Sequence, residues 1–386
     1  MIAPGAWLGL LGGGQLGRMF TMAAQSMGYK VMVLDPGELS PAGSVADDHL
    51  RADYLDREAL KKMAARCAAA TTEFENVPAE SLAFLAQDAV VSPAAAAVAV
   101  AQDRIREKTF LTEGGFAVAP FAVVNGKQDL EEARLAPLLP GILKIARLGY
   151  DGKGQIRVSS SREVGNAFAD LGGKACVLEK FLDLEREISV VVARGFDNSV
   201  VSFPVSENQH AGGILDISIV PARISGALAQ TARAMAIQVA QRLDYRGVLC
   251  VEFFVLRDGQ LVINEIAPRP HNSGHYTIDA CITSQFEQQV RVLCGLPLGD
   301  TAAHCPAVMV NLLGDLWAAG EPRWEHVWRQ ARAKLHLYGK AEAKPGRKMG
   351  HFTVLADDIG HALSVASEIK AQLLADARPQ RAVGAA

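Results

Sequence analysis

Short apolar runs alternate with helix-like stretches over the first hundred residues. Residues 7–11, residues 29–34 and a segment ending at Phe74 read as buried strands. Between the first two runs, residues 16–27 carry apolar side chains at helical spacing, and Gly28 ends that helix. Strand–helix–strand order predicts parallel strands joined by right-handed crossovers. We therefore expect an α/β domain over residues 1–95.

The pattern changes after Pro93, which opens an alanine-rich helix expected from Ala94 to about Thr112. Short strands and one short helix then predict a small α+β subdomain over residues 118–182. Strands are expected at 187–205, an amphipathic helix at 226–243, a long hairpin at 247–267 and a helix from Ser284. The chain after about 296 is less regular. These patterns predict a second domain over 96–295, which includes the subdomain, and a C-terminal domain over 296–386.

Composition narrows the functional classes. The 386 residues carry a formal net charge of −3, which gives no basic footprint for nucleic acid or an anionic membrane and favours small-molecule substrates. The six cysteines form no C-x-x-C pair, which argues against a structural zinc site or a disulfide framework and fits a reducing compartment. Apolar runs are too short to span a membrane and the N-terminus lacks a signal-peptide layout, so we expect a cytoplasmic protein.

A glycine-rich turn follows the first strand. Gly12, Gly14 and Gly17 have the spacing G-x-G-x-x-G, and Asp35 ends the second strand. This is the dinucleotide-binding fingerprint of Rossmann-like sheets, and it raises the hypothesis of an oxidoreductase. The same strand, turn and helix N-terminus also form a general anion-receptive corner. The motif alone therefore does not choose a cofactor.

The hairpin "VLCVEFFVLRDGQLVINEIAPRP" is more informative. A two-residue turn at Asp258-Gly259 would place Glu252 directly opposite Glu265. Two facing carboxylates repel each other, and divalent cations between them would make the pairing favourable. The alternative is a pair of solvated glutamates on an outer face. Asn264 points to the opposite face in an ideal strand.

A candidate phosphate-binding loop lies upstream of this hairpin. Lys144 lies in a strand-like run, and Gly149, Gly152 and Gly154 surround Lys153. Glycines let backbone N–H groups approach phosphate oxygens, and lysines add positive charge. The alternative is a plain turn with a surface lysine. The loop is not a Walker motif, so together with the carboxylate pair it indicates ATP bound with magnesium in another way.

At this point the sequence resembles the ATP-grasp superfamily and, within it, the 5-(carboxyamino)imidazole ribonucleotide synthetases. The matching segments are "GGGQLGRM" (12–19), "TTEFENVP" (71–78), "QDRIREK" (102–108), "GYDGKGQ" (149–155), "EREISVVVARG" (185–195), "INEIAPRPHNSGHYT" (263–277), "SQFEQQVR" (284–291) and "KPGRKMGH" (344–351). The resemblance implies an ATP-grasp fold with a Rossmann-like N-terminal domain, a lid subdomain and a C-terminal domain. It implies that ATP and bicarbonate form carboxyphosphate, which carboxylates the exocyclic amine of 5-aminoimidazole ribonucleotide. It also implies a homodimer.

The resemblance assigns roles to residues at matching positions. Glu252 and Glu265 would bind Mg²⁺. ATP would be held by residues from the helix at 104, the lid and the hairpin: Arg104, Lys144, Gly149, Tyr150, Asp151, Gly152, Lys153, Gly154, Gln155, Glu179, Lys180, Phe181, Leu182, Glu187, His210, Asn264 and Glu265. In this set the segment 179–182 would meet the adenine and Glu187 the ribose.

Bicarbonate and the acceptor would bind beside the nucleotide. Arg269, His271 and Lys153 are the candidate catalytic residues, with Arg269 orienting bicarbonate. A surface arginine and packing histidines, His275 included, are the alternatives. The acceptor would be surrounded by Gly14, Gln15, Leu16, Glu73, Tyr150, Asp151, Asn272, Ser273, Lys340, Arg347 and Lys348. Under this hypothesis Asp35 is an ordinary strand-end residue, and without the resemblance "KPGRK" would be a solvated basic loop.

Three rival functions remain open on sequence alone. A formate-dependent glycinamide ribonucleotide formyltransferase is a sister ATP-grasp enzyme with the same ATP machinery, but Tyr150-Asp151 and "HNSGH" favour the carboxylase. An oxidoreductase would leave both glutamates and the 149–155 loop unexplained. A non-catalytic nucleotide-binding scaffold is the third possibility, although both carboxylates and both loop-region lysines are present.

Overall fold

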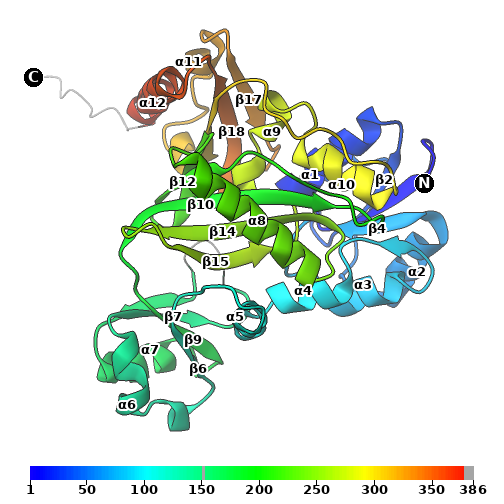
Figure 1. The fold of residues 1–386 in the computed structure, drawn as a ribbon. Coiled ribbons are helices and arrows are strands. Elements are labelled where there is room, and N and C mark those ends of the chain that lie inside the picture. Colours follow the sequence, from blue (N-terminus) through cyan, green and yellow to red (C-terminus); the bar gives the residue numbers. More distant parts are fainter. Residues whose placement is uncertain (150–152, 378–386) are drawn as a thin grey trace, which may run out of the picture.

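The computed structural model describes residues 1–149 and 153–377. Its strands form sheets of five, four and nine strands. Figure 1 shows the four-stranded sheet and its helices standing apart as a lid, while the N-terminal domain and the C-terminal elements flank the largest sheet. The ATP-grasp arrangement expected from the resemblance is confirmed.

The N-terminal sheet is parallel and has the order β3-β2-β1-β4-β5. The sequence predicted β1, β2 and β4; β3 and β5 have only three and two residues, too few for a pattern to show. The elements are β1 (Trp7–Leu11), α1 (Gln15–Ser26), β2 (Lys30–Leu34), β3 (Asp48–Leu50), α2 (Arg57–Arg66), β4 (Ala69–Thr72), α3 (Ala79–Leu85) and β5 (Val90–Val91).

The single helix expected from Ala94 to Thr112 is wrong. The structure has two helices, α4 (Ala95–Ala101) and α5 (Arg104–Glu113). Asp103 separates them because its carboxylate accepts hydrogen bonds from the backbone N–H groups of Ile105 and Arg106, a helix N-cap. The break starts a new helix at Arg104, whose side chain reaches the hairpin carboxylate of Glu265.

The lid is an antiparallel sheet of order β6-β9-β7-β8. Leu143 and Phe168 belong to its own apolar core, which is separate from the core of the large sheet. Its elements are β6 (Phe121–Val124), η1 (Lys127–Asp129), α6 (Glu132–Leu135), η2 (Ala136–Leu138), β7 (Gly141–Ile145), β8 (Gln155–Val158), α7 (Ser161–Asp170) and β9 (Cys176–Lys180).

The nine-stranded sheet carries the hairpin and continues into the C-terminal residues. Its order is β15-β14-β10-β12-β13-β16-β18-β17, with β11 paired to β10. Helix α8 packs against β10, β11 and β14. The elements before residue 300 are β10 (Leu184–Arg194), β11 (Val200–Ser202), β12 (Ser206–Ala211), β13 (Ile214–Val220), α8 (Gly226–Arg242), β14 (Gly247–Leu256), β15 (Leu261–Ala267), η3 (Asn272–Gly274), α9 (Thr277–Ala280) and α10 (Gln285–Leu293).

The expectation of a less regular tail is also wrong. Strand β16 pairs with β13 and so extends the large sheet beyond the hairpin domain. Polar and glycine residues interrupt the apolar pattern of β17 and β18, so the local pattern does not predict these strands. The elements are β16 (Ala307–Leu313), η4 (Gly314–Trp317), α11 (Glu325–Trp328), β17 (Ala333–Leu337), β18 (Lys348–Leu355) and α12 (Ile359–Asp376).

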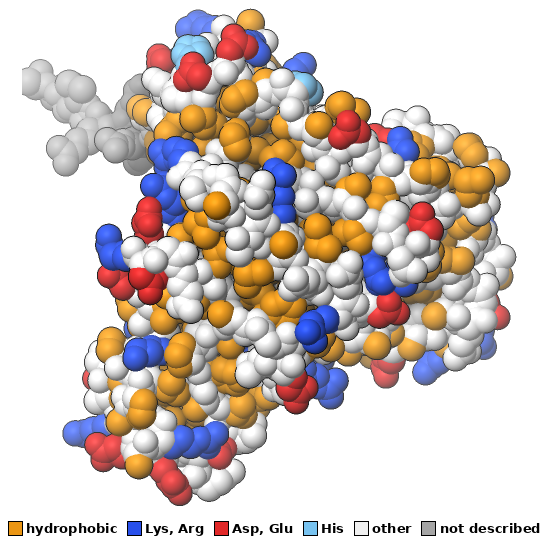
Figure 2. All heavy atoms as spheres, viewed as in Figure 1, with side chains coloured by type: hydrophobic (Ala, Val, Ile, Leu, Met, Phe, Trp, Pro, Cys, Tyr) orange, Lys and Arg blue, Asp and Glu red, His pale blue; other side chains and the backbone are white. Residues whose placement is uncertain are grey.

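The surface and the cysteines agree with the composition. Figure 2 shows positive and negative side chains interspersed with hydrophobic ones on the face in view. All six cysteines are free and five of them are buried. None of the helices in the described part of the chain is long and apolar enough to cross a membrane.

Candidate active site

The two hairpin glutamates face each other as predicted, but the turn between the strands differs from the prediction. Leu256, not Arg257, pairs across the turn with Gln260, so the loop has three residues and not two. Gly259 adopts a positive φ of 82°, which suits the last position of such a loop. A register shift between Phe253 and Glu252 then restores the pairing of Glu252 with Glu265.

The register shift explains a second feature, the orientation of Asn264. Phe253 pairs with Ile263 and Glu252 with Glu265, so Asn264 is the extra residue of a β-bulge. A bulge re-aims side chains, and both Asn264 and Glu265 line the same cavity. The expectation that Asn264 points away from the glutamates is therefore wrong. Its side-chain oxygen Oδ1 is buried without a hydrogen-bond partner in the described residues.

Each hairpin carboxylate lies beside a cationic side chain from another element. Arg104 Nη1 is 3.0 Å from Glu265 Oε2, and His271 Nε2 is 3.0 Å from Glu252 Oε1. Burial alone would raise the pKa of Glu252, but the charge and hydrogen bond of His271 outweigh it and the pKa falls. Burial likewise opposes the charged form of His271, yet Cys250 and Glu252 raise its pKa. The pair is therefore held as carboxylate and imidazolium.

Two buried lysines reach the same region, Lys144 from the lid strand β7 and Lys108 from helix α5. Glu179 Oε2 lies 3.1 Å from Lys144 Nζ and 3.3 Å from Lys108 Nζ. Burial alone would raise the pKa of Glu179, but the two ammonium groups lower it to about 2. Lys108 also donates to the backbone carbonyl of Asn264 at 2.9 Å. This network ties the lid strands β7 and β9 to the bulge that carries the site.

Other predicted nucleotide residues lie around the same space. Glu187 on β10 and His210 on β12 form an ion pair of 3.0 Å, and both line the cavity. Phe181 lines it too, whereas Lys180 and Leu182 do not. Tyr150, Asp151 and Gly152 lie outside the described residues.

The glycine-rich turn is already filled by the protein's own carboxylates. Glu73 accepts hydrogen bonds from the backbone N–H groups of Gly14 and Gly17, the latter at 2.6 Å. Burial raises the pKa of Glu73 to about 7, although these N–H groups act in the opposite direction. Asp35 accepts from Gly13 N at 2.8 Å and from the Tyr54 hydroxyl at 2.6 Å. Asp35 therefore holds the turn, and describing it as an ordinary strand-end residue is wrong.

Arg269, in the loop after the hairpin, is held in place by an ion pair. Arg269 Nε donates to Glu75 Oε2 at 2.5 Å. Burial alone would raise the pKa of Glu75, but Arg269 lowers it to about 2. Ser273 is fully buried below the His271 ring, with its Oγ 2.8 Å from Nδ1, and does not line the cavity. Asn272 does line it, and both polar atoms of its amide are buried without a partner in the described residues.

Of the basic residues predicted near the C-terminus, only Lys348 lines the cavity. Lys348, at the start of β18, lines the cavity, and Lys340 donates to its backbone carbonyl at 2.6 Å. Arg347 is exposed and donates to the Glu342 carbonyl at 3.1 Å, so the structure does not bring it to the cavity. His275 is fully buried against Phe286 and other rings, which supports the packing alternative.

These residues share one cavity of about 1010 Å³, at the upper end of small-molecule sites. It lies where the N-terminal domain, the lid, the large sheet and the start of β18 meet. The predicted residues that line it are Gln15, Leu16, Glu73, Arg104, Lys144, Gly149, Lys153, Gln155, Phe181, Glu187, His210, Glu252, Asn264, Glu265, Arg269, His271, Asn272 and Lys348. Those that do not line it are Gly14, Gly154, Glu179, Lys180, Leu182, Ser273, Lys340 and Arg347.

Sequence reasoning missed two acidic residues of the cavity, Glu75 and Glu107. Glu107 is buried, accepts from the backbone N–H of Ile266 at 2.6 Å, and has its pKa raised to about 8 by burial and by Glu265. Both residues lie inside the family segments "TTEFENVP" and "QDRIREK", and this position could have marked them as candidate site residues. Neither segment shows which cation or N–H group each carboxylate meets.

The fold and the cavity define an ATP-grasp enzyme. Three family comparisons agree: a ribonucleotide synthetase preATP-grasp domain matches residues 6–102, an ATP-grasp domain 109–286, and a phosphoribosylaminoimidazole carboxylase C-terminal domain 307–364. The chain belongs to the N5-carboxyaminoimidazole ribonucleotide synthase family. It is 44% identical to the N5-carboxyaminoimidazole ribonucleotide synthase of Bacillus subtilis (strain 168), over 92% of this chain and 93% of that protein.

Solved structures give the same result. The N5-carboxyaminoimidazole synthetase of Staphylococcus aureus complexed with ADP is 38% identical, with a TM-score of 0.89 over 95% of this chain and 98% of that chain. The synthase from Aspergillus clavatus, in complex with ADP and 5-aminoimidazole ribonucleotide, is 32% identical, with a TM-score of 0.86 over 96% and 98%. These relatives favour the carboxylase over the formyltransferase and oxidoreductase alternatives.

Proposed function

We propose that this chain carboxylates the exocyclic amine of 5-aminoimidazole ribonucleotide, with ATP and bicarbonate as co-substrates. Bicarbonate attacks the γ-phosphorus of ATP, ADP leaves, and carboxyphosphate forms. The amine then takes the carboxyl group, and phosphate leaves. The product is 5-(carboxyamino)imidazole ribonucleotide, an intermediate of purine biosynthesis. The observation that carries the proposal is the Glu252–Glu265 pair in one cavity with Lys144, in a chain of this family.

The residues present fit a magnesium ion. Glu252 and Glu265 offer facing carboxylates, and the partnerless Asn264 Oδ1 points to a third oxygen donor. Oxygen donors of this kind, completed by substrate phosphates, are what Mg²⁺ prefers. When bound, the ion neutralises phosphate charge. Arg104 and His271, which accompany the carboxylates here, then become available to anionic ligands.

The chain's own cations align the nucleotide. Lys144 and Arg104 face the space between lid and hairpin, and Gly149, Lys153 and Gln155 border it from the lid. Phosphoryl transfer needs this positioning and charge stabilisation more than covalent help from the protein. Glu187, paired with His210, binds the ribose hydroxyls, and Phe181 of the segment 179–182 meets the adenine.

Arg269 orients bicarbonate. Its Nε donates to Glu75 and its Nη1 to the Pro270 carbonyl, which leaves Nη2 to hold a planar anion. His271 carries positive charge beside it, supported from below by Ser273. Carboxyphosphate hydrolyses in open water, so we propose that the lid closes over this end of the cavity during turnover.

The acceptor ribonucleotide binds between the glycine turn and β18. Gln15, Leu16, Glu73 and Asn272 surround the imidazole and ribose, and Lys348 with Lys340 attracts the phosphate. The support is that Gln15, Leu16, Glu73, Asn272 and Lys348 line the cavity from the N-terminal domain, η3 and β18, whereas Glu187 and His210 line it from β10 and β12. The two polar atoms of Asn272 without a partner in the described residues add to it.

The direct test is phosphate release measured with each substrate omitted in turn. We expect release only when ATP, bicarbonate and 5-aminoimidazole ribonucleotide are all present, with one phosphate per carboxylated product. Release with glycinamide ribonucleotide and formate, and none with the aminoimidazole substrate, would instead identify the formyltransferase.

We also propose three further properties. The chain divides into domains at 1–95, 96–295 and 296–386, forms a homodimer and works in the cytoplasm. Leu11, Met32, Leu60 and Leu82 form an apolar core within the N-terminal domain, which supports the first of these boundaries. The dimer and the cytoplasmic location rest on the resemblance and the composition. Light scattering after size exclusion tests the dimer, and a monomer mass would reject it.

A further inference from the structure

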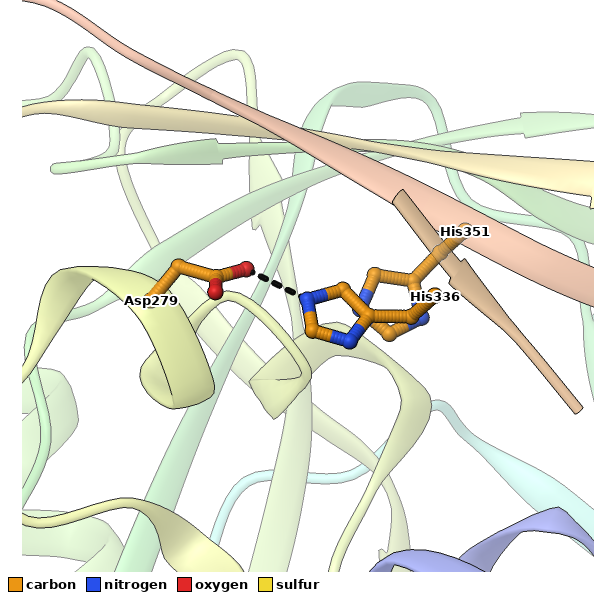
Figure 3. Close-up of side chains that lie close together, drawn as sticks. All are labelled: Asp279, His336 and His351. Carbon is orange, nitrogen blue, oxygen red and sulfur yellow. Dashed lines mark hydrogen bonds and ion pairs between the residues drawn. The ribbon is translucent and has the colours of Figure 1, made fainter. Parts of the chain in front are cut away.

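A histidine pair lies outside the cavity, on neighbouring C-terminal strands. His336 on β17 is directly opposite His351 on β18, and their rings stack with centroids 4.5 Å apart at 17°. Asp279, in the short helix α9, places Oδ2 2.8 Å from His336 Nε2. Figure 3 shows the carboxylate at the edge of the stacked rings, with the hydrogen bond drawn to His336. One possible ligand atom from each residue lies within 4.8 Å of the others.

The imidazole of His351, the more deeply buried of the two rings, has one nitrogen without a hydrogen-bond partner in the described residues. His351 is fully buried, and its Nδ1 lies 2.8 Å from the Tyr338 hydroxyl. Its Nε2 has no hydrogen-bond partner within the described residues. A buried polar atom without a partner costs about 1–3 kcal/mol, so a native protein usually supplies a ligand or water for it. When the hydroxyl accepts the Nδ1 proton, Nε2 offers its lone pair.

We propose that Asp279, His336 and His351 form a metal site separate from the ATP site, selective for a transition-metal dication such as zinc. Two imidazole nitrogens and one carboxylate oxygen are a zinc-type donor set, with a fourth position left to water. Magnesium prefers oxygen donors and is disfavoured here. Binding requires the neutral imidazoles and the ionised carboxylate as ligands. The Tyr338 hydroxyl holds the other nitrogen of His351, as an orienting partner of a metal-bound imidazole does.

Small movements complete the coordination. Ligand bonds of about 2.0–2.2 Å require the three donor atoms to close to roughly 3.3 Å from one another. The stacked rings must also open, because nearly parallel rings do not aim both lone pairs at one point. His336 can turn, since its side chain is 27% exposed, whereas Tyr338 keeps His351 in place. The partly exposed ring also provides the route by which an ion enters.

The scattered cysteines argued against structural zinc, but this site uses none of them. Its ligands come from α9, β17 and β18, so an ion would link the segment that follows Arg269 and His271 to the C-terminal strands. Strand β18 begins at Lys348, which lines the cavity. The ion would therefore stabilise the wall on which the acceptor phosphate is proposed to bind.

The test titrates Co²⁺ alone into the full-length protein after removal of metals by chelation. The Glu265→Gln background removes one carboxylate of the ATP site. We expect one Co²⁺ per chain with visible absorption bands of a four- or five-coordinate nitrogen–oxygen site, and a higher Tm with Zn²⁺. His336→Asn should weaken Co²⁺ binding at least tenfold.

His304→Asn is the matched control. His304 is exposed and contacts the backbone carbonyl of Asp279 at 2.9 Å, but it is not part of the group. The control should bind Co²⁺ like its parent. Asp279→Asn provides a second test of the ligand set, and circular dichroism with chelator present checks that each variant is folded. Equal Co²⁺ titrations for the parent and folded His336→Asn, or no binding by the parent, would overturn the proposal.

Discussion

Two parts of the cavity, the glycine turn and the hairpin, hold buried carboxylates, and different groups stabilise them. At the glycine turn, Glu73 accepts backbone N–H groups of Gly14 and Gly17 and keeps a pKa of about 7. At the hairpin, Glu252 lies beside His271, and its pKa is lowered. Backbone dipoles are partial charges fixed in place, whereas side-chain cations carry full charge and can move. The first part is thus suited to hydrogen bonding and the second to ion binding.

The largest expected effect is at the hairpin. Glu265→Gln removes one of the two facing negative charges and leaves Arg104 without its ion pair. Loss of several kcal/mol of charge stabilisation predicts a decrease in kcat of about 10²–10³-fold, measured as ADP release with all substrates present. Glu185→Gln, on the exposed end of β10, is the control and should retain turnover. Full activity in Glu265→Gln would refute the assignment of this residue to magnesium.

At the glycine turn, a larger side chain should cause a steric clash. A Cβ at Gly14 would lie 2.5 Å from Glu73 Oε1, so Gly14→Ala must displace the carboxylate. We expect a loss of about 1–3 kcal/mol in unfolding free energy. The KM for 5-aminoimidazole ribonucleotide should rise, while the KM for ATP stays unchanged. Gly226→Ala at the start of α8, where a Cβ meets nothing within 4 Å, is the matched control. An equal rise in both KM values would contradict the separation of the two parts.

A pH profile tests the buried carboxyl between these two parts of the cavity. Burial raises the pKa of Glu107 from 4.5 to about 8, so the folded protein binds this proton more tightly than the unfolded chain. Its contribution to stability is complete below pH 4.5 and is lost as the pH rises toward 8. Glu107→Gln mimics the protonated form and should become more stable than the parent over that range.

The expected gain is at least about 1.4 kcal/mol at pH 8, the equivalent of one pKa unit. Denaturant unfolding at pH 5 to 8.5 measures it. Glu113→Gln, an exposed position on the same helix, should give a difference that does not change with pH. Parallel pH profiles for Glu107→Gln and the parent would show that Glu107 ionises normally.

The smallest expected effect is an absence of nicotinamide binding. The N–H groups of Gly13, Gly14 and Gly17 already donate to Asp35 and Glu73. A dinucleotide pyrophosphate would have to displace both carboxylates. Titration with NADH should leave its fluorescence unchanged, and saturable enhancement would restore the oxidoreductase hypothesis.

Part of the site followed correctly from incorrect reasoning about the turn. A two-residue loop was expected at Asp258-Gly259, but the loop has three residues, and the bulge at Asn264 restores the register. Turn residues report loop geometry, whereas a bulge depends on contacts that the local pattern does not encode. Lys108, which binds the Asn264 carbonyl at 2.9 Å, is one such contact.

The sequence by itself determined the parallel N-terminal sheet, the hairpin glutamates, the lid lysine and, through its segments, the family. These features depend on periodicity, turn chemistry and residue type, which are local properties of a chain. Only the tertiary structure decided which groups neutralise each carboxylate. Arg269 meets Glu75 across 194 positions, and Glu107 meets Ile266 across 159. The Asp279–His336–His351 group likewise exists only where a short helix meets two distant strands. Such pairings arise when the domains pack together. Packing removes water from the buried charges, and a buried charge is stable only when it is paired or hydrogen-bonded.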